Sequence, residues 1–242
     1  MDPCSTTILF IPGAWHSAEC FADVANSLGK SGFNTELIEL PSVGPKRHLD
    51  GFSSDVATIR HRAFQAISAG QKIVLVAHSY GGVPTTEAIR DFSSHVIHFV
   101  LVCSFLLQKD ASLLSTVGGE PIPWWGVSPD KLEMNAKTPK DIFYKDISQE
   151  DADVYISRLK PHSYKTFQSR LTYEGWRYVP TTYLYCTLDA ALPIAAQRRM
   201  VQETAKGVNI RTEELVTGHS PFFKDPAAVA GMIERAVRLG GS

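Results

Sequence analysis

Short apolar runs alternate with longer amphipathic segments along most of the chain. The runs are aliphatic or aromatic and end at proline, glycine or polar residues, which is typical of strands buried on both faces of a sheet. Strands are predicted at residues 8–11, 34–40, 73–77, 96–103, 182–186 and 209–216. Apolar residues spaced three or four apart predict helices at residues 21–31, 53–69, 83–92 and 226–239.

This alternation predicts an α/β fold class. Strands that alternate with helices form a mostly parallel sheet with helices on both of its faces. Right-handed crossovers place the C-terminal ends of the strands along one edge, and ligands bind at that edge in sheets of this kind. The turns that follow the strands are therefore the expected location of a functional site.

One stretch interrupts the alternation. Residues 105–178 contain no strong buried strand, but they include Trp124, Trp125, several prolines and two amphipathic segments at 139–144 and 149–160. We predict that this stretch forms a helical cap, which is inserted between two core strands and covers the strand-end edge of the sheet.

The whole chain is expected to form a single domain. Its 242 residues contain no repeat, low-complexity tract or linker, so the core is assigned to 1–104 and 179–242, on either side of the cap. A hydrophobic fraction of 44% and a net charge of −1 fit a globular enzyme and offer no attraction to nucleic acid or to an anionic membrane. We expect a small, largely apolar substrate as the partner of a monomer or homodimer.

The cysteines and the N-terminus indicate the compartment. Cys4, Cys20, Cys103 and Cys186 form no CxxC pair or Cys/His cluster in the sequence, so no metal site is predicted. Cys103 and Cys186 lie in or near apolar runs and are expected to be buried free thiols, which fits a reducing compartment. Residues 1–7 do not resemble a signal peptide, and no run approaches the roughly 20 apolar residues that span a bilayer. A cytoplasmic location is the expectation.

A candidate nucleophile follows the most hydrophobic run, at residues 73–77. The string A-H-S-Y-G-G at residues 77–82 lies between this strand and the next helix. Such a strand-to-helix turn, with small residues two positions on either side of the serine, is the context of a nucleophile elbow. The alternative is a serine that caps a helix in a nucleotide-binding turn, but the glycine pattern of a dinucleotide site is missing. Ser79 is therefore the predicted nucleophile.

Serine needs a base within hydrogen-bond reach to act as a nucleophile at neutral pH. Among the eight histidines, His219 is the best placed, because it follows the last predicted strand in the loop 217–221. His78 directly precedes the serine and is expected to pack beneath the elbow. His16 lies in the first strand-end loop and is expected to line the pocket.

An acid must hold this histidine in one tautomer and compensate its positive charge. Asp189 follows the strand 182–186, and the order Ser79, Asp189, His219 is the one used by folds with a nucleophile elbow. Asp110 is the alternative acid, but it lies within the expected cap. Two glutamates inside the last predicted strand should point to a face of the sheet rather than to its edge.

Two backbone N–H groups are expected to stabilise the oxyanion of an acyl-transfer reaction. One is the amide of Tyr80, which directly follows the nucleophile. The other is assigned to Ala14, in the loop 12–16, for which a plain strand-to-helix turn is the alternative. The predicted pocket lining consists of aromatic residues near these loops and in the cap, which are also common in cores: Trp15, His16, Phe105, Trp124, Trp125 and Phe222.

These segments resemble those of small cap-bearing α/β-hydrolases related to plant methyl esterases and hydroxynitrile lyases. The similar segments are I-P-G-A-W-H (11–16), A-H-S-Y-G-G (77–82), C-T-L-D-A-A-L-P (186–193) and G-H-S-P (218–221), with F-Y-K-D (143–146) similar to microbial members. The resemblance covers nearly the whole chain. It implies a core of about eight strands, a cap, no cofactor, and a triad of Ser79, Asp189 and His219.

The chain departs from this family pattern in two places and lacks one feature of the lyases. Pro12 stands where many relatives have histidine, and Ala77 replaces a glycine, but neither change removes a backbone donor. Hydroxynitrile lyases of this group use an additional lysine beside the base. Here Gly218 and Ser220 flank the histidine, which argues against a lyase.

The leading hypothesis is hydrolysis of an ester or a related acyl bond through an acyl-enzyme at Ser79. A C–C bond hydrolase, a lactonase, or a cyclase or lyase of secondary metabolism could use the same triad, because fold and triad do not fix the substrate. A third hypothesis is a non-catalytic ligand receptor on this fold. Such receptors usually lose a triad member, whereas all three are present here.

Overall fold

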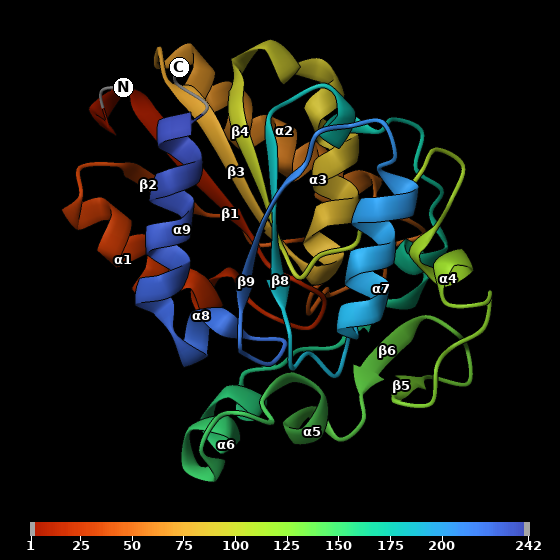
Figure 1. Ribbon diagram of the computed structural model, residues 1–242. Helices are drawn as coiled ribbons and strands as arrows, with labels where there is room; N and C mark the ends of the chain where they lie inside the picture. The colour runs from red at the N-terminus through yellow and green to blue at the C-terminus, as the bar shows by residue number, and fades with distance from the viewer. Residues whose placement is uncertain (1–2, 240–242) are drawn as a thin grey trace.

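The sheet at the centre of the computed structural model, which describes residues 3–239, contains six strands that all run parallel (Figure 1). Their spatial order is β2-β1-β3-β4-β8-β9. The strands are β1 (Thr6–Ile11), β2 (Asn34–Leu37), β3 (Lys72–His78), β4 (Val96–Val102), β8 (Thr181–Cys186) and β9 (Arg211–Leu215). Each overlaps the residue range predicted for it, although β2 and β9 are mostly polar.

The sheet is smaller than the resemblance implied. About eight strands were expected, whereas residues 3–239 form a main sheet of six. Directly before β1 lies a 3-10 turn, Pro3–Ser5, and β2 pairs with β1 at that edge of the sheet. The described chain therefore supplies no further strand beside β2.

Helices cover both faces of the sheet, as the alternation predicted. They are α1 (Ala22–Lys30), α2 (Ser53–Ser68), α3 (Gly82–Ala88), α7 (Ile194–Arg199), α8 (Pro221–Lys224) and α9 (Pro226–Leu239). The pleat of β3 separates two hydrophobic cores, since alternate side chains of a strand point to opposite faces. Val74 and Val76 pack in the core that contains α1 and α9, whereas Ile73 and Leu75 pack in the core that contains α2 and α3.

Two helical details were not predicted. The expected helix 83–92 ends at Ala88 and continues as a 3-10 turn, Ile89–Asp91. Helix α7 was missed because it is only six residues long and runs into a π-helical turn, Met200–Thr204, which breaks the 3.6-residue period.

The insertion between β4 and β8 contains the helices α4 (Leu113–Thr116), α5 (Pro139–Phe143) and α6 (Gln149–Ser157). It also contains an antiparallel sheet of β5 (Trp125–Val127), β6 (Glu133–Ala136) and β7 (His162–Ser163). These strands have two to four residues, which is too short for an alternating pattern to show in the sequence. Much of the insertion, including α5, α6, β5 and β6, lies below the sheet in Figure 1, whereas α4 lies at the side, to the right of α7.

Two further expectations concern the cysteines and the membrane. Cys103 and Cys186 are buried and form no disulfide, as predicted. No helix within residues 3–239 combines the length and the apolar character needed to cross a lipid bilayer.

A buried carboxylate connects α2 to the segment that follows the edge strand β2 and to the turn that follows β3. Asp55, in the first turn of α2, is fully buried and accepts hydrogen bonds from the Ser42 amide (2.9 Å) and the Tyr80 hydroxyl (2.6 Å). Burial raises the pKa of Asp55 from its usual 3.8 to about 6, although both hydrogen bonds act in the opposite direction. This carboxyl group therefore ionises unfavourably within the fold.

We predict that Asp55 makes the protein less stable as the pH rises from about 4 to about 6. Between these values the folded state holds a proton that the unfolded chain has lost, so its contribution to the free energy of unfolding falls with rising pH. The difference between the two pKa values corresponds to about 3 kcal/mol. Asp55→Asn should flatten this part of the pH profile, measured by urea unfolding at pH 4, 5, 6 and 7.

The control for this experiment is Asp153→Asn, at an exposed position of α6. It should keep the wild-type slope. A profile for Asp55→Asn that falls as steeply as that of the wild type between pH 4 and 6 would show that Asp55 is not the group responsible.

Candidate active site

The turn after β3 holds Ser79 in a strained conformation. Its φ of 51° lies in the left-handed region, which non-glycine residues rarely adopt. A methyl group at Gly81 would collide with the carbonyl oxygen of Pro12, so this position needs glycine. The Ser104 hydroxyl (2.6 Å) and the Phe105 amide (3.2 Å) both donate to the carbonyl oxygen of Ser79. These contacts fix the serine side chain at the strand-end edge.

The three residues predicted from separate strand ends meet at this turn. Ser79 Oγ lies 3.1 Å from His219 Nε2, and His219 Nδ1 lies 2.7 Å from Asp189 Oδ2. Because a carboxylate only accepts, the Nδ1–H donates to Asp189, which leaves Nε2 to accept the serine O–H. All three residues are buried, with exposed fractions of 8%, 2% and 6% for Ser79, His219 and Asp189. The geometry suits transfer of the serine proton to the histidine.

Asp189 is held by a dense set of donors. Its Oδ1 accepts the amides of Ala191 and Leu192, both at 2.8 Å, and its Oδ2 is 3.3 Å from the Gln197 side-chain nitrogen. Gln197 is fully buried on α7. Its side chain also donates to the carbonyls of Leu192 (2.7 Å) and Cys186 (3.1 Å) and accepts the Cys186 amide (3.1 Å). It was not predicted from the sequence, where a single glutamine outside any predicted element carries no signal of burial.

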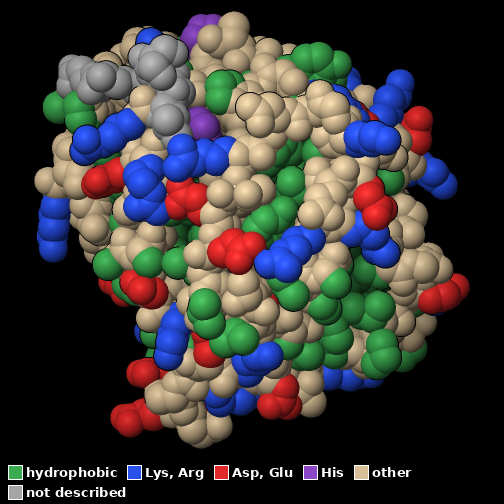
Figure 2. Space-filling model, viewed as in Figure 1, with side chains coloured by type: hydrophobic (Ala, Val, Ile, Leu, Met, Phe, Trp, Pro, Cys, Tyr) green, Lys and Arg blue, Asp and Glu red, His purple; other side chains and the backbone are tan. Residues whose placement is uncertain are grey.

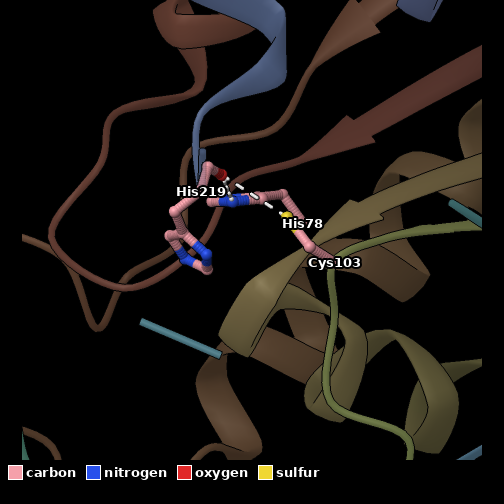
Figure 3. Close-up of side chains that lie close together, drawn as sticks. All are labelled: His78, Cys103 and His219. Carbon is pink, nitrogen blue, oxygen red and sulfur yellow. Dashed lines mark hydrogen bonds between the residues drawn. The ribbon is translucent and has the colours of Figure 1, made fainter. Parts of the chain in front are cut away.

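A second set of contacts holds the backbone of His219 (Figure 3). His78 Nε2 lies 2.8 Å and Cys103 Sγ 3.4 Å from the His219 carbonyl oxygen, and both groups donate to it. Burial keeps the pKa of His78 well below its usual value and raises that of the Cys103 thiol, so both groups are neutral donors. The centre of the His219 ring lies 4.6 Å from that of His78, but its two nitrogens bond Ser79 and Asp189.

The ligating atoms of His78, Cys103 and His219 come within 4.8 Å of one another, a cluster that the sequence did not suggest. His78 Nε2 and Cys103 Sγ bond the His219 carbonyl, and both ring nitrogens of His219 bond Ser79 and Asp189, so only His78 Nδ1 has no partner among the described residues. We therefore interpret the cluster as an anchor for the histidine loop and assign no metal to it.

A cavity of about 330 Å³ opens beside Ser79 and His219, beneath the inserted segment. Ala14 and Tyr80 line it, as do four of the predicted pocket residues: Trp15, Phe105, Trp124 and Trp125. Further lining residues that sequence reasoning missed include Leu113, Val117, Ile122, Phe167, Leu192 and Met200. Figure 2 shows hydrophobic side chains gathered over α4, α7 and the β5–β6 region. The site is therefore suited to an apolar molecule.

One charged side chain lies at this cavity. Arg199, at the end of α7, is the only Lys, Arg, Asp or Glu among the lining residues within the described chain. Its side chain is exposed and also borders a groove on the outer surface. The interior of the cavity is thus left without a fixed charge other than that of the triad.

Two predicted pocket residues lie outside the cavity. His16 is buried behind the first loop, where it contacts the Ala14 carbonyl and the Tyr144 hydroxyl, both at 2.8 Å. The neighbouring Trp15 has a left-handed φ of 65°, and its side chain lines the cavity. The side chain of His16 does not line it. Phe222 packs beneath the elbow, with its ring centre 5.0 Å from that of His78. Both pocket assignments are corrected.

Comparisons with known proteins agree with this architecture. A family model described as the alpha/beta hydrolase family matches residues 8–232. The chain is 28% identical over 95% of both chains to the alpha/beta hydrolase nvfD of Aspergillus novofumigatus, and 24% identical over 98% of both to methyl jasmonate esterase 1 of Vitis vinifera. Its fold matches that of a pyrethroid hydrolase from Sphingobium faniae with a TM-score of 0.80, at 19% identity, over 96% and 97% of the two chains.

We predict that Gln197 stabilises the loop that carries Asp189. Gln197→Leu leaves buried backbone groups of Cys186 and Leu192 without partners, and each such group costs about 1–3 kcal/mol. The free energy of unfolding, measured with urea, should fall by about 2–4 kcal/mol.

Gln202→Leu is the matched control, because Gln202 is exposed on the following turn. Its effect should stay within about 0.5 kcal/mol. Equal stabilities of the two variants would contradict the role given to Gln197.

Proposed function

The chain belongs to the alpha/beta hydrolase family, and on this basis we propose that it is a serine esterase that acts through Ser79, His219 and Asp189. The observation that carries the proposal is the pair of hydrogen bonds that joins these residues, at 3.1 and 2.7 Å. The esterases among its relatives support an ester, or a related acyl bond, as the group that is cleaved. The apolar cavity supports a small, largely apolar substrate.

In the first half of the reaction, Ser79 Oγ attacks the carbonyl carbon of the ester while its proton passes to His219 Nε2. Asp189 compensates the imidazolium through the Nδ1–H hydrogen bond. The amides of Ala14 and Tyr80, which both border the cavity, donate to the oxygen that becomes negative. The tetrahedral intermediate then collapses, and His219 gives its proton to the leaving alcohol.

In the second half, water attacks the acyl-enzyme. His219 takes a proton from this water as it adds to the acyl carbon, and the same two amides hold the second oxyanion. Collapse breaks the bond to Ser79 Oγ, which recovers its proton from His219. The products are an alcohol and a carboxylic acid, and the enzyme returns to its starting state.

The proposal predicts that Ser79→Ala abolishes hydrolysis of short p-nitrophenyl esters. Loss of the nucleophile of a triad costs about 10⁶-fold in kcat, so the remaining rate should lie at the detection limit of a colorimetric assay. The same variant should no longer react with a fluorophosphonate probe, as judged by intact-protein mass spectrometry.

Ser94→Ala, at an exposed serine outside the site, serves as the control and should keep full activity and labelling. Wild-type hydrolysis by Ser79→Ala would end the proposal. A wild-type protein that binds the esters but neither hydrolyses them nor reacts with the probe would favour a receptor instead.

A further inference from the structure

The end of α5 and the residues after it contact both loops of the site. We call Phe143, Tyr144 and Asp146 the cap clamp. We propose that Tyr144 and Asp146 are positioning residues, which hold the oxyanion loop and the base loop in register from the cap. This inference rests on the proposed function and adds residues to it that the triad and the oxyanion amides do not include.

Asp146 holds the residue directly before the base. Its Oδ2 accepts the Gly218 amide at 2.7 Å, a charge-assisted hydrogen bond of the stronger kind. Its Oδ1 is buried and has no hydrogen-bond partner among the described residues. Among the described residues, the hydrogen bond to Gly218 is thus the only one that this carboxylate makes, and it forms no ion pair with another side chain.

The shape of the base loop is matched to this carboxylate. A methyl group at Gly218 would lie 2.6 Å from Asp146 Oδ1 and 3.1 Å from its Cγ. Its nearest neighbours all belong to Asp146, and the φ of Gly218 lies outside the left-handed region. A side chain at this position would therefore displace the Asp146 carboxylate, so the approach of the cap, and not the backbone conformation, favours glycine here.

Tyr144 reaches the oxyanion loop through His16. The Ala14 carbonyl can only accept, so His16 Nδ1 carries the hydrogen and donates to it at 2.8 Å. His16 Nε2 then accepts the Tyr144 O–H, also at 2.8 Å. Burial lowers the pKa of His16 to about 4, which keeps the ring neutral and this relay intact at neutral pH. The relay ends on Ala14, whose amide is a proposed oxyanion donor.

Phe143 fills the space between the two loops. Its ring centre lies 5.6 Å from that of His219 and 5.5 Å from that of Trp15, and its side chain is buried. It therefore packs against both loops that its neighbours hold by hydrogen bonds.

The sheet topology explains why such a link is useful. The oxyanion loop follows β1 and the base loop follows β9, and three strands separate these two in the sheet. Parallel pairing fixes each strand, and His78 and Cys103 hold the His219 carbonyl, but none of these contacts joins the base loop to the oxyanion loop. A bridge across the strand ends restrains both, and a misplacement of about 1 Å can cost roughly 100-fold in rate.

The test compares Asp146→Ala, Asp146→Asn and Tyr144→Phe with Lys145→Gln, an exposed residue of the same segment. The readouts are kcat and KM for a p-nitrophenyl ester, the rate of fluorophosphonate labelling at Ser79, and the melting temperature. Asp146→Ala should lower kcat and the labelling rate about tenfold or more with little change in KM, since it frees the base loop. Asp146→Asn keeps an acceptor for the Gly218 amide and should recover to within about threefold of the wild type.

Tyr144→Phe should lower kcat and labelling as well, whereas Lys145→Gln should leave both unchanged. If Asp146→Ala and Tyr144→Phe remain folded and label as fast as the wild type, the inference is overturned. Loss that is equal in Asp146→Ala and Asp146→Asn would also overturn it, because the accepting oxygen would then be irrelevant. Absence of labelling in the wild type itself would instead refute the proposed function.

Gly218→Ala alone keeps the inference testable if Asp146→Ala is unstable, and where both variants fold, a double-mutant cycle tests the contact between the two residues. In the wild-type background, Gly218→Ala should reduce kcat about tenfold or more, because the new methyl group displaces the Asp146 carboxylate. In the Asp146→Ala background the same change should cost less than about threefold. If the double variant lowers kcat by the product of the two single reductions, the two residues do not act through one contact, and the clamp is contradicted.

Discussion

The site depends on the close approach of two backbone segments, the turn after β3 and the loop after β1. Gly81 packs against the Pro12 carbonyl, and Ser79 takes the left-handed φ that turns its side chain out of the sheet. The same approach brings the first strand-end loop, with Ala14, next to the nucleophile. A strained residue persists only where its surroundings determine its conformation, and here the two hydrophobic cores on either face of β3 supply that constraint.

Around this turn, the parallel sheet supplies the remaining parts from distant points in the chain. Asp189 follows β8 and His219 follows β9, and buried neutral groups hold the Asp189 carboxylate and the His219 carbonyl. Gln197 orders the acid loop, while His78 and Cys103 hold the carbonyl of the base. The inserted segment adds the apolar wall of the cavity and, through the cap clamp, contacts with both loops.

The positions of the strands along the chain and the candidate triad could be predicted because they rest on local patterns, whereas the spatial order of the strands was not predicted. Ser79 stands in a recognisable string after the most apolar run, and Asp189 and His219 each follow a strand. Gln197 and Asp146 could not be found in this way, since their roles arise from hydrogen bonds to residues that no periodicity identifies. The pocket assignments of His16 and Phe222 were wrong because side-chain direction in a loop depends on backbone angles that residue type does not reveal.

The central claim is that the nucleophile, the base and two amides converge on one point. It is tested most directly by a crystal structure of the protein after reaction with a fluorophosphonate. The account predicts a phosphorus atom bonded to Ser79 Oγ, with one phosphoryl oxygen within about 2.7–3.1 Å of both the Ala14 and Tyr80 nitrogens. An adduct on another residue, or an oxygen that faces away from both amides, would contradict it.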